Sequence, residues 1–377
     1  LNAAPTGLES PGRLKAAPTN VRADVGADLG RPEGAVVGAG FSRPVLAIAS
    51  CGNAALAAAV VARAAGRELQ VFVPTWADES VIARLRALGA HLTPCPREPG
   101  VAGDPCYLRF HDALDRGVIP FCCQGPDNGL TIEGGSTLVW EMIDALGDRR
   151  LDRLFVQVGG GALASACAQG VADAVRLGRL ARAPRLHTVQ TRGGFPLKRA
   201  YDLVLTRMVR RLSAGLKSGP TYEKYVGPTC EKYVGPNFGS GEYAALADFV
   251  RAHAESLIVR DELRYAATHR SEFMWPWDTE PKSIATGILD DETYDWLAVV
   301  KGMLASGGGP VVVDESVLID AYRLAHETTG INVDHTGAAG LAGLMPMARD
   351  GVVGPHEKVA VILSPGVYSD LSKLRAM

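Results

Sequence analysis

Residues 156–162 read Val-Gln-Val-Gly-Gly-Gly-Ala, a β-rich run that passes through three consecutive glycines into a helix-forming stretch. Because glycine has no side chain, the backbone N–H groups of such a loop can wrap closely around an anion. The start of the following helix adds a partial positive charge. A tight structural turn is the alternative, but it seldom needs three glycines. The pattern therefore predicts a phosphate site on residues 159–161.

Short β-rich runs alternate with helical stretches on both sides of this loop, which is typical of an α/β protein with parallel sheets. We expect strands at residues 45–49, 69–73, 91–94, 118–122, 154–158, 186–190, 310–313 and 359–363. We expect helices at residues 54–65, 79–88, 136–146, 163–175, 318–326 and 338–347. A charged turn at 147–152 separates two units, and residues 193–295 look less regular.

The composition excludes several classes of protein. The chain has 377 residues, a net charge of −2 and 21% charged residues, so no excess of positive charge points to nucleic acid or anionic lipid. The apolar run at 54–61 is far shorter than the roughly 20 residues of a membrane span. We see no secretory signal in residues 1–30. Seven cysteines without paired spacing favour a reducing compartment, the cytoplasm, and show no metal-ligand pattern.

Two further turns carry residues suited to ligand binding. Ser50, Cys51, Gly52 and Asn53 lie between a predicted strand and a helix, where backbone N–H groups suit a carboxylate or phosphate. The structural alternative is a capped turn, with Ser50 or Asn53 as the cap. Ser364 follows the last predicted strand, where its hydroxyl could bond a ligand's ring nitrogen or simply the local backbone.

The glycine loop could instead bind a dinucleotide, because Gly159, Gly161 and Ala164 fit the loose dinucleotide fingerprint. An acidic residue should then end the next strand and hold the ribose. That strand is followed by Thr191 and Arg192, which disfavours NAD and leaves an NADP-dependent oxidoreductase as the alternative. A nucleotide P-loop is excluded, because no Lys-Ser or Lys-Thr follows the glycines.

Together these segments resemble the fold type II pyridoxal-phosphate enzymes, which include threonine synthase, serine/threonine dehydratase, cysteine synthase and the tryptophan synthase β chain. The similarity lies in residues 49–53, 71–74, 85–90, 159–161 and 363–364. Residues 133–137 and 281–288 look most like the threonine synthase branch. The resemblance implies two open, twisted, mostly parallel sheet domains with the cofactor between them. We expect a smaller domain at 51–150, a larger one from 1–50 and 151–377, and a homodimer.

The resemblance also implies roles for individual residues. Asn53 would bond the phenolic oxygen of pyridoxal 5′-phosphate, while the backbone of Ser50–Asn53 would hold the carboxylate of a small amino acid. The phosphate of the cofactor would lie on Gly159, Gly160, Gly161 and Ala162. Ser364, a neutral partner for the ring nitrogen, fits elimination or replacement at Cβ or Cγ better than transamination. We expect a threonine-synthase-like lyase first, then a serine/threonine dehydratase, then a cysteine-synthase-like transferase.

The Schiff-base lysine is where the sequence departs from the family pattern. Residues 18–22 resemble the segment that should carry this lysine, yet they contain none. Lys15, the only lysine upstream of Ser50, is one candidate. A second explanation is a covalently modified lysine missing from the written chain between Val21 and Arg22. The third is a non-catalytic relative.

Several other features allow two interpretations each. The cluster of Arg207, Arg210, Arg211 and Lys217 could recognise a substrate phosphate, or could be a solvated helix face. Cys51 could be a reactive thiol or a small apolar residue, and His335 a cleft residue or a structural one. The six residues 223–228 recur at 231–236, for which a surface loop is the plain interpretation.

Overall fold

The computed structural model describes residues 44–101, 103–147, 150–214, 240–277, 279 and 281–364, without the side chains of 213–214 and 240–244. It confirms the predicted α/β fold class, with two four-stranded parallel sheets in one compact unit. Lys15, Lys217, the junction of Val21 and Arg22, and both copies of the six-residue repeat lie outside the described residues.

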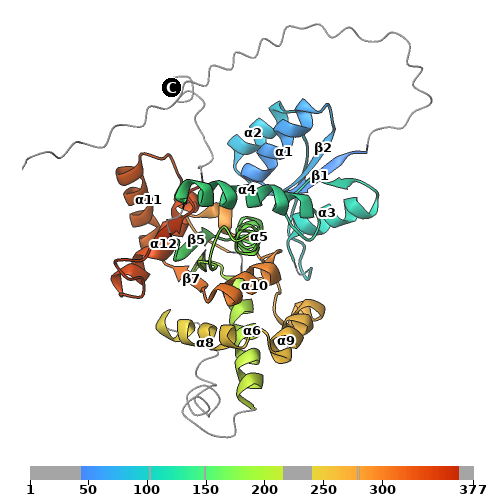
Figure 1. Cartoon of the computed structure of the whole chain (residues 1–377). Coiled ribbons are helices and arrows are strands. Elements are labelled where there is room, and N and C mark those ends of the chain that lie inside the picture. The colour runs from blue at the N-terminus through green and yellow to red at the C-terminus, as the bar shows by residue number, and fades with distance from the viewer. Residues whose placement is uncertain are drawn as a thin grey trace, which may run out of the picture. The chain divides into compact units, whose positions relative to one another are not determined.

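The first sheet has the strand order β3-β2-β1-β4, formed by β1 (Leu46–Ala49), β2 (Leu69–Pro74), β3 (His91–Cys95) and β4 (Ile119–Pro120). Helices α1 (Asn53–Ala64), α2 (Glu79–Ala87) and α3 (Pro105–Asp115) accompany it (Figure 1). The buried residues of α1 are Ala55, Ala58, Ala59 and Ala62, one helical stripe of small side chains. That stripe lets α1 approach the sheet closely.

The second sheet has the order β7-β6-β5-β8, formed by β5 (Arg153–Gln157), β6 (Arg185–Thr191), β7 (Gly309–Val313) and β8 (Val359–Val361). On β5, Leu154 and Val156 pack into one hydrophobic cluster while Phe155 packs into another, so both faces of the sheet are covered. The helices around it are α4 (Gly129–Leu146), α5 (Ala162–Arg176), α6 (Pro196–Ala214), α8 (Ser240–Ala252), α9 (Leu257–Thr268), α10 (Trp296–Ser306), α11 (Glu315–Thr329) and α12 (His335–Arg349). Short 3₁₀ turns lie at Arg270–Glu272 and Thr286–Ile288.

The region 193–295 is more regular than the sequence suggested, because it contains α6, α8 and α9. On α6 the buried residues Leu197, Ala200, Tyr201, Val204, Leu205 and Met208 follow helical spacing. The apolar stripe was therefore present in the sequence, but many charged residues on the same helix obscured it. Helix α4 also begins seven residues earlier than predicted, at Gly129 rather than Ser136.

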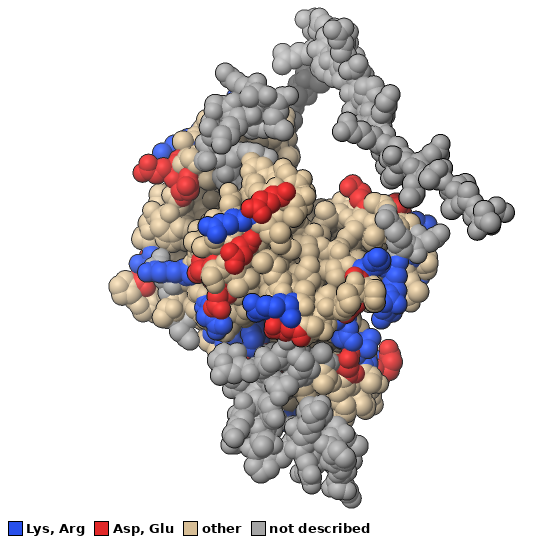
Figure 2. Space-filling view, turned by 90° about the vertical axis from the view of Figure 1, so that its left-hand side faces the viewer, with Lys and Arg blue, Asp and Glu red and all other residues tan. Residues whose placement is uncertain are grey.

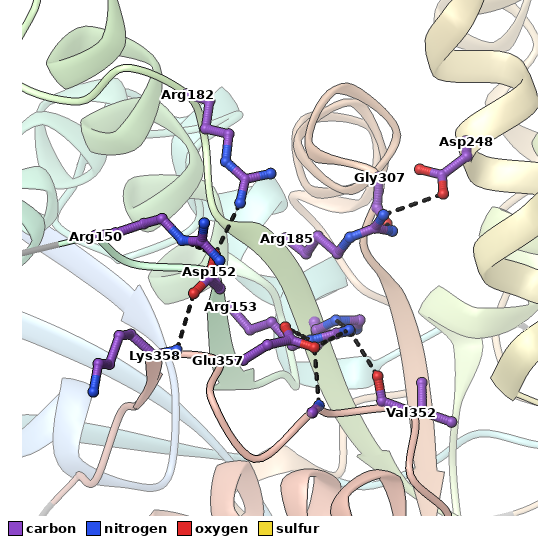
Figure 3. A network of polar contacts seen from close by, with 12 residues as sticks. Arg150, Asp152, Arg153, Arg182, Arg185, Asp248, Gly307, Val352, Glu357 and Lys358 are labelled. Carbon is purple, nitrogen blue, oxygen red and sulfur yellow. Dashed lines mark hydrogen bonds and ion pairs between the residues drawn. The ribbon is translucent and has the colours of Figure 1, made fainter.

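Charged side chains at the amino end of the second sheet are paired with one another (Figure 3). Buried Asp152, just before β5, accepts from Arg150 at 2.6 Å and Arg182 at 2.8 Å. Arg153 reaches Glu357 at 2.6 Å, beside the buried ring of His187. Burial, reinforced by the charge of Arg153, lowers the pKa of His187 to about 3, so this ring is neutral. These groups fix the start of the strands.

The face of the molecule drawn in Figure 2 carries charged side chains of both signs. On the face drawn in Figure 2, acidic and basic side chains are interspersed. This mixture agrees with the near-neutral net charge of the chain. Across the described residues, no helix combines the length and the apolar character that crossing a membrane requires.

The packing of α12 on β6 gives a stability test. Gly343→Ala would place a methyl group 2.4 Å from a Val189 Cγ atom, so we expect a loss of about 1–3 kcal/mol in the free energy of unfolding. Gly134→Ala, on an open face of α4, is the control and should gain up to about 1 kcal/mol from helix propensity. Denaturant unfolding measures both. Equal effects of the two substitutions would contradict the close packing.

Candidate functional site

The glycine loop lies at the carboxyl end of β5, the edge at which ligands bind in open α/β sheets. Gly161 is the N-cap residue of α5 with a φ of 98°, a conformation that favours glycine. No side chain caps this helix, so its first N–H groups are left to other partners. The sequence-predicted strand, glycine run and helix are therefore confirmed as local structure.

Residues 288–295 pack directly against the loop. The Thr293 hydroxyl donates to the Gly159 carbonyl at 2.9 Å, and the Asp295 N–H donates to the Gly160 carbonyl at 3.0 Å. A Cβ atom on Gly159 would lie 2.9 Å from the Ile288 Cα atom, and one on Gly161 would lie 2.8 Å from the Thr293 Cγ2 atom. Close approach of this segment is thus a structural reason for glycine at these positions.

Asp290 lies on the loop itself. Its Oδ2 atom lies 2.4 Å from where a Gly159 Cβ atom would be and 3.6 Å from where a Gly160 Cβ atom would be. Burial, together with the charges of Asp104 and Asp291, raises the pKa of this carboxyl to about 7. A carboxylate thus lies against the glycines that the sequence assigned to a phosphate.

The turn at residues 50–53 approaches the same carboxylate. Helix α1 begins at Asn53 with Gly52 as its N-cap residue and no capping side chain, and the Gly52 N–H faces the Ser50 hydroxyl at 3.4 Å. Burial, then Asp290 and Asp104, raises the pKa of the Cys51 thiol to about 11. Cys51 is therefore protonated at neutral pH, which favours the small apolar residue over the reactive thiol.

Ser364 lies beyond β8, the neighbour of β5 in the sheet. The buried side chain of Gln157 donates through Nε2 to the Ser364 Oγ at 2.9 Å. Among the described residues, the Gln157 Oε1 and the Thr191 Oγ1 are buried without a hydrogen-bond partner. Both belong to strand ends at the carboxyl edge of the sheet, so polar atoms there remain available to a ligand.

The residues present fit a phosphate-bearing cofactor. The first N–H groups of α5 have no capping side chain, and glycine leaves them open to an anion such as a phosphate. A serine hydroxyl and unsatisfied polar atoms lie along the same edge. The identity of the lysine is untested, because each of its predicted positions lies outside the described residues.

Acidic residues that the sequence reasoning missed gather around this segment. Asp295 accepts the Gly125 N–H at 3.0 Å, and burial raises its pKa to about 6. Asp104 accepts the Tyr294 hydroxyl at 3.1 Å. A cavity of about 590 Å³ includes Asp104, Tyr294 and Asp295 in its wall. The run of acidic residues in 290–295, Asp-Asp-Glu-Thr-Tyr-Asp, was the signal available in the sequence for all of them except Asp104.

Three of the other candidates, Arg207, Arg211 and His335, have structural partners. Arg207 and Arg211 both bind the buried Glu262, at 2.8 and 2.6 Å, which ties α6 to α9 rather than forming a phosphate site. His335 stacks on Tyr322, with ring centroids 4.6 Å apart. The described residues contain no cluster of side chains able to hold a metal ion.

Known proteins share this architecture. A family model described as "Pyridoxal-phosphate dependent enzyme" matches residues 37–261, more than half of the chain. An aspartate racemase structure is 17% identical with a TM-score of 0.56, over 89% of this chain and 77% of that chain. An L-serine ammonia-lyase from Rhizomucor miehei is 18% identical with a TM-score of 0.55, over 89% of this chain and 81% of that chain. A threonine deaminase from T.th. is 18% identical with a TM-score of 0.53, over 87% of this chain and 79% of that chain. At these identities the structures show a shared fold. No curated protein matches the sequence.

The raised pKa values predict how stability depends on pH. Asp290 and Asp295 titrate near 7 and 6 in the folded chain and near 3.8 when unfolded, so the folded state binds more protons between these values. The free energy of unfolding should therefore fall, by about 1 kcal/mol or more, as the pH rises from about 5 to about 8. Urea unfolding at several pH values measures this.

In the variant Asp290→Asn, the free energy of unfolding should decrease less with rising pH, since the substitution removes one buried charge while keeping the shape of the side chain. The exposed Asp320 provides the matched control, and Asp320→Asn should leave the slope unchanged. Parallel curves for wild type and Asp290→Asn would show that Asp290 is not the group responsible.

Proposed function

The chain belongs to the family of pyridoxal-phosphate dependent enzymes, and we propose that it catalyses elimination or replacement at Cβ or Cγ of a small amino acid. One observation supports this most directly. The uncapped glycine loop follows β5, and β5 pairs with β8, the strand that leads to Ser364. The loop suits the cofactor phosphate and the serine suits its ring nitrogen. A cytoplasmic homodimer is part of this proposal.

The side chains suggest a division of roles at the site. Gly159, Gly160, Gly161 and Ala162 would hold the phosphate, and the turn at residues 50–53 would hold the substrate carboxylate on its backbone N–H groups. Asn53 would bond the phenolic oxygen. Pyridoxal phosphate, when bound, supplies an electron sink for the charge that develops at the substrate Cα atom.

The hydrogen bond to Ser364 supports elimination. Because the Gln157 Nε2 donates to the Ser364 Oγ, that oxygen acts as the acceptor and its own hydrogen is left for another acceptor. An unprotonated ring nitrogen is such an acceptor. A neutral partner does not force a positive charge onto the ring, which then withdraws electrons more weakly. That property fits the loss of a leaving group better than transamination.

Serine/threonine dehydratase activity is now favoured over a threonine-synthase-like reaction. Two of the arginines that could have recognised a phosphorylated substrate, Arg207 and Arg211, are bound to Glu262. Two structures of the same fold are named as a threonine deaminase and an L-serine ammonia-lyase. The similarity of residues 133–137 and 281–288 to the threonine synthase branch keeps that reaction as the second candidate.

Turnover of an amino-acid panel tests this proposal. We expect serine or threonine to yield ammonia and a 2-oxo acid, while O-phosphohomoserine reacts more slowly. Ser364→Ala should lower kcat by about tenfold or more, because it removes the hydrogen-bond partner of the ring nitrogen. Stereochemical inversion without ammonia release, or a preference for the phosphorylated substrate, would contradict the dehydratase assignment.

The lysine has its own test. Borohydride reduction of the pyridoxal-phosphate-loaded protein, followed by peptide mass mapping, should label a single lysine in residues 1–43. A label on Lys15 would select that residue, and a label on an additional residue between Val21 and Arg22 would select the missing lysine. A protein that binds the cofactor without forming any reducible linkage would be the non-catalytic relative.

A further inference from the structure

Asp290 has no place in the roles above, yet it lies against the glycine loop. Its Oδ2 atom lies 2.4 Å and 3.6 Å from where Cβ atoms on Gly159 and Gly160 would be. A phosphate held on this loop would lie close to the Asp290 carboxylate, and the two negative charges would repel each other.

We propose that Asp290 is the internal occupant of this anion site, and that a phosphate binds there only when the Asp290 carboxylate leaves or is neutralised. The inference rests on the proposed function, because that proposal assigns the loop to the cofactor phosphate. It adds a residue that controls how tightly, and at which pH, the phosphate binds.

The charges around Asp290 support this exclusion. Asp104 and Asp291 are the charged groups that act on it most strongly, and both are acidic. The charge of Asp290 also raises the pKa of the Cys51 and Cys123 thiols and of the Tyr294 phenol. Arg97 is engaged with the Asp291 carboxylate. A doubly charged phosphate would enter an already negative environment, so an ionised Asp290 opposes it.

The backbone on either side limits how Asp290 can move. Hydrogen bonds fix Thr293 and Asp295 to the glycine loop, and the Trp277 N–H donates to the Asp291 carbonyl at 3.0 Å. Tyr294 is tied to Asp104. Rotation of the Asp290 side chain, rather than withdrawal of the whole segment, is therefore the expected route. The displaced carboxylate remains in the site, where its protonation would weaken its repulsion of the phosphate.

The affinity of the full chain for inorganic phosphate tests the proposal without any need for turnover. After removal of bound pyridoxal phosphate, calorimetric titration would compare wild type, Asp290→Asn and the control Asp320→Asn. We expect Asp290→Asn to bind phosphate about tenfold more tightly or better at about pH 8, and the control to match wild type. The difference in phosphate affinity between Asp290→Asn and wild type should be smaller at about pH 6, where wild-type Asp290 is mostly protonated. Comparing variants at one pH removes the titration of phosphate itself.

Asp290→Ala, which removes both charge and hydrogen-bonding oxygen, is the second variant and should also bind phosphate more tightly. Titration of pyridoxal phosphate into the same proteins distinguishes the role of Asp290 from the proposed function of the site. If all variants bind pyridoxal phosphate and inorganic phosphate with wild-type affinity, the role of Asp290 is refuted while the proposed function stands. If none binds either ligand, the assignment of the loop to a phosphate fails, and this inference fails with it.

Discussion

The contact between the glycine loop and residues 288–295 is the constraint on which the site depends. Two hydrogen bonds from Thr293 and Asp295 reach loop carbonyls, and side chains larger than hydrogen at Gly159 or Gly161 would collide with this segment. The same segment places the Asp290 carboxylate against Gly159 and Asp295 onto the Gly125 N–H. The three glycines therefore permit close packing, and in the proposed function they also expose N–H groups to the phosphate.

The charged groups at the amino end of the second sheet differ in their pairing from those at its carboxyl end. At its amino end, arginines and carboxylates neutralise one another, and the buried histidine among them is uncharged (Figure 3). At its carboxyl end, burial raises the pKa values of Asp290 and Asp295, and Asp295 accepts a backbone N–H. The paired charges hold strands in register, whereas the acids at the opposite edge are free to change protonation near neutral pH.

Much of the framework was predictable because its signals are local. Strand and helix periodicity located β5, α5 and α12 within a few residues, and the glycine run located the loop. Asp290 was not found, because its role depends on a chain segment about 130 residues away folding back onto Gly160. The arginines on α6 misled for the same reason, since the partner Glu262 belongs to a different helix.

The relative affinity for pyridoxal phosphate and pyridoxal tests the central claim most directly. The two ligands share the ring and aldehyde and differ in the phosphate, so their ratio of affinities reports what the glycine loop contributes. Titration followed by visible absorption should show pyridoxal phosphate binding at least about a hundredfold more tightly, as expected for several charge-assisted hydrogen bonds. Equal affinities would contradict the account, because the loop would then make no use of the anion.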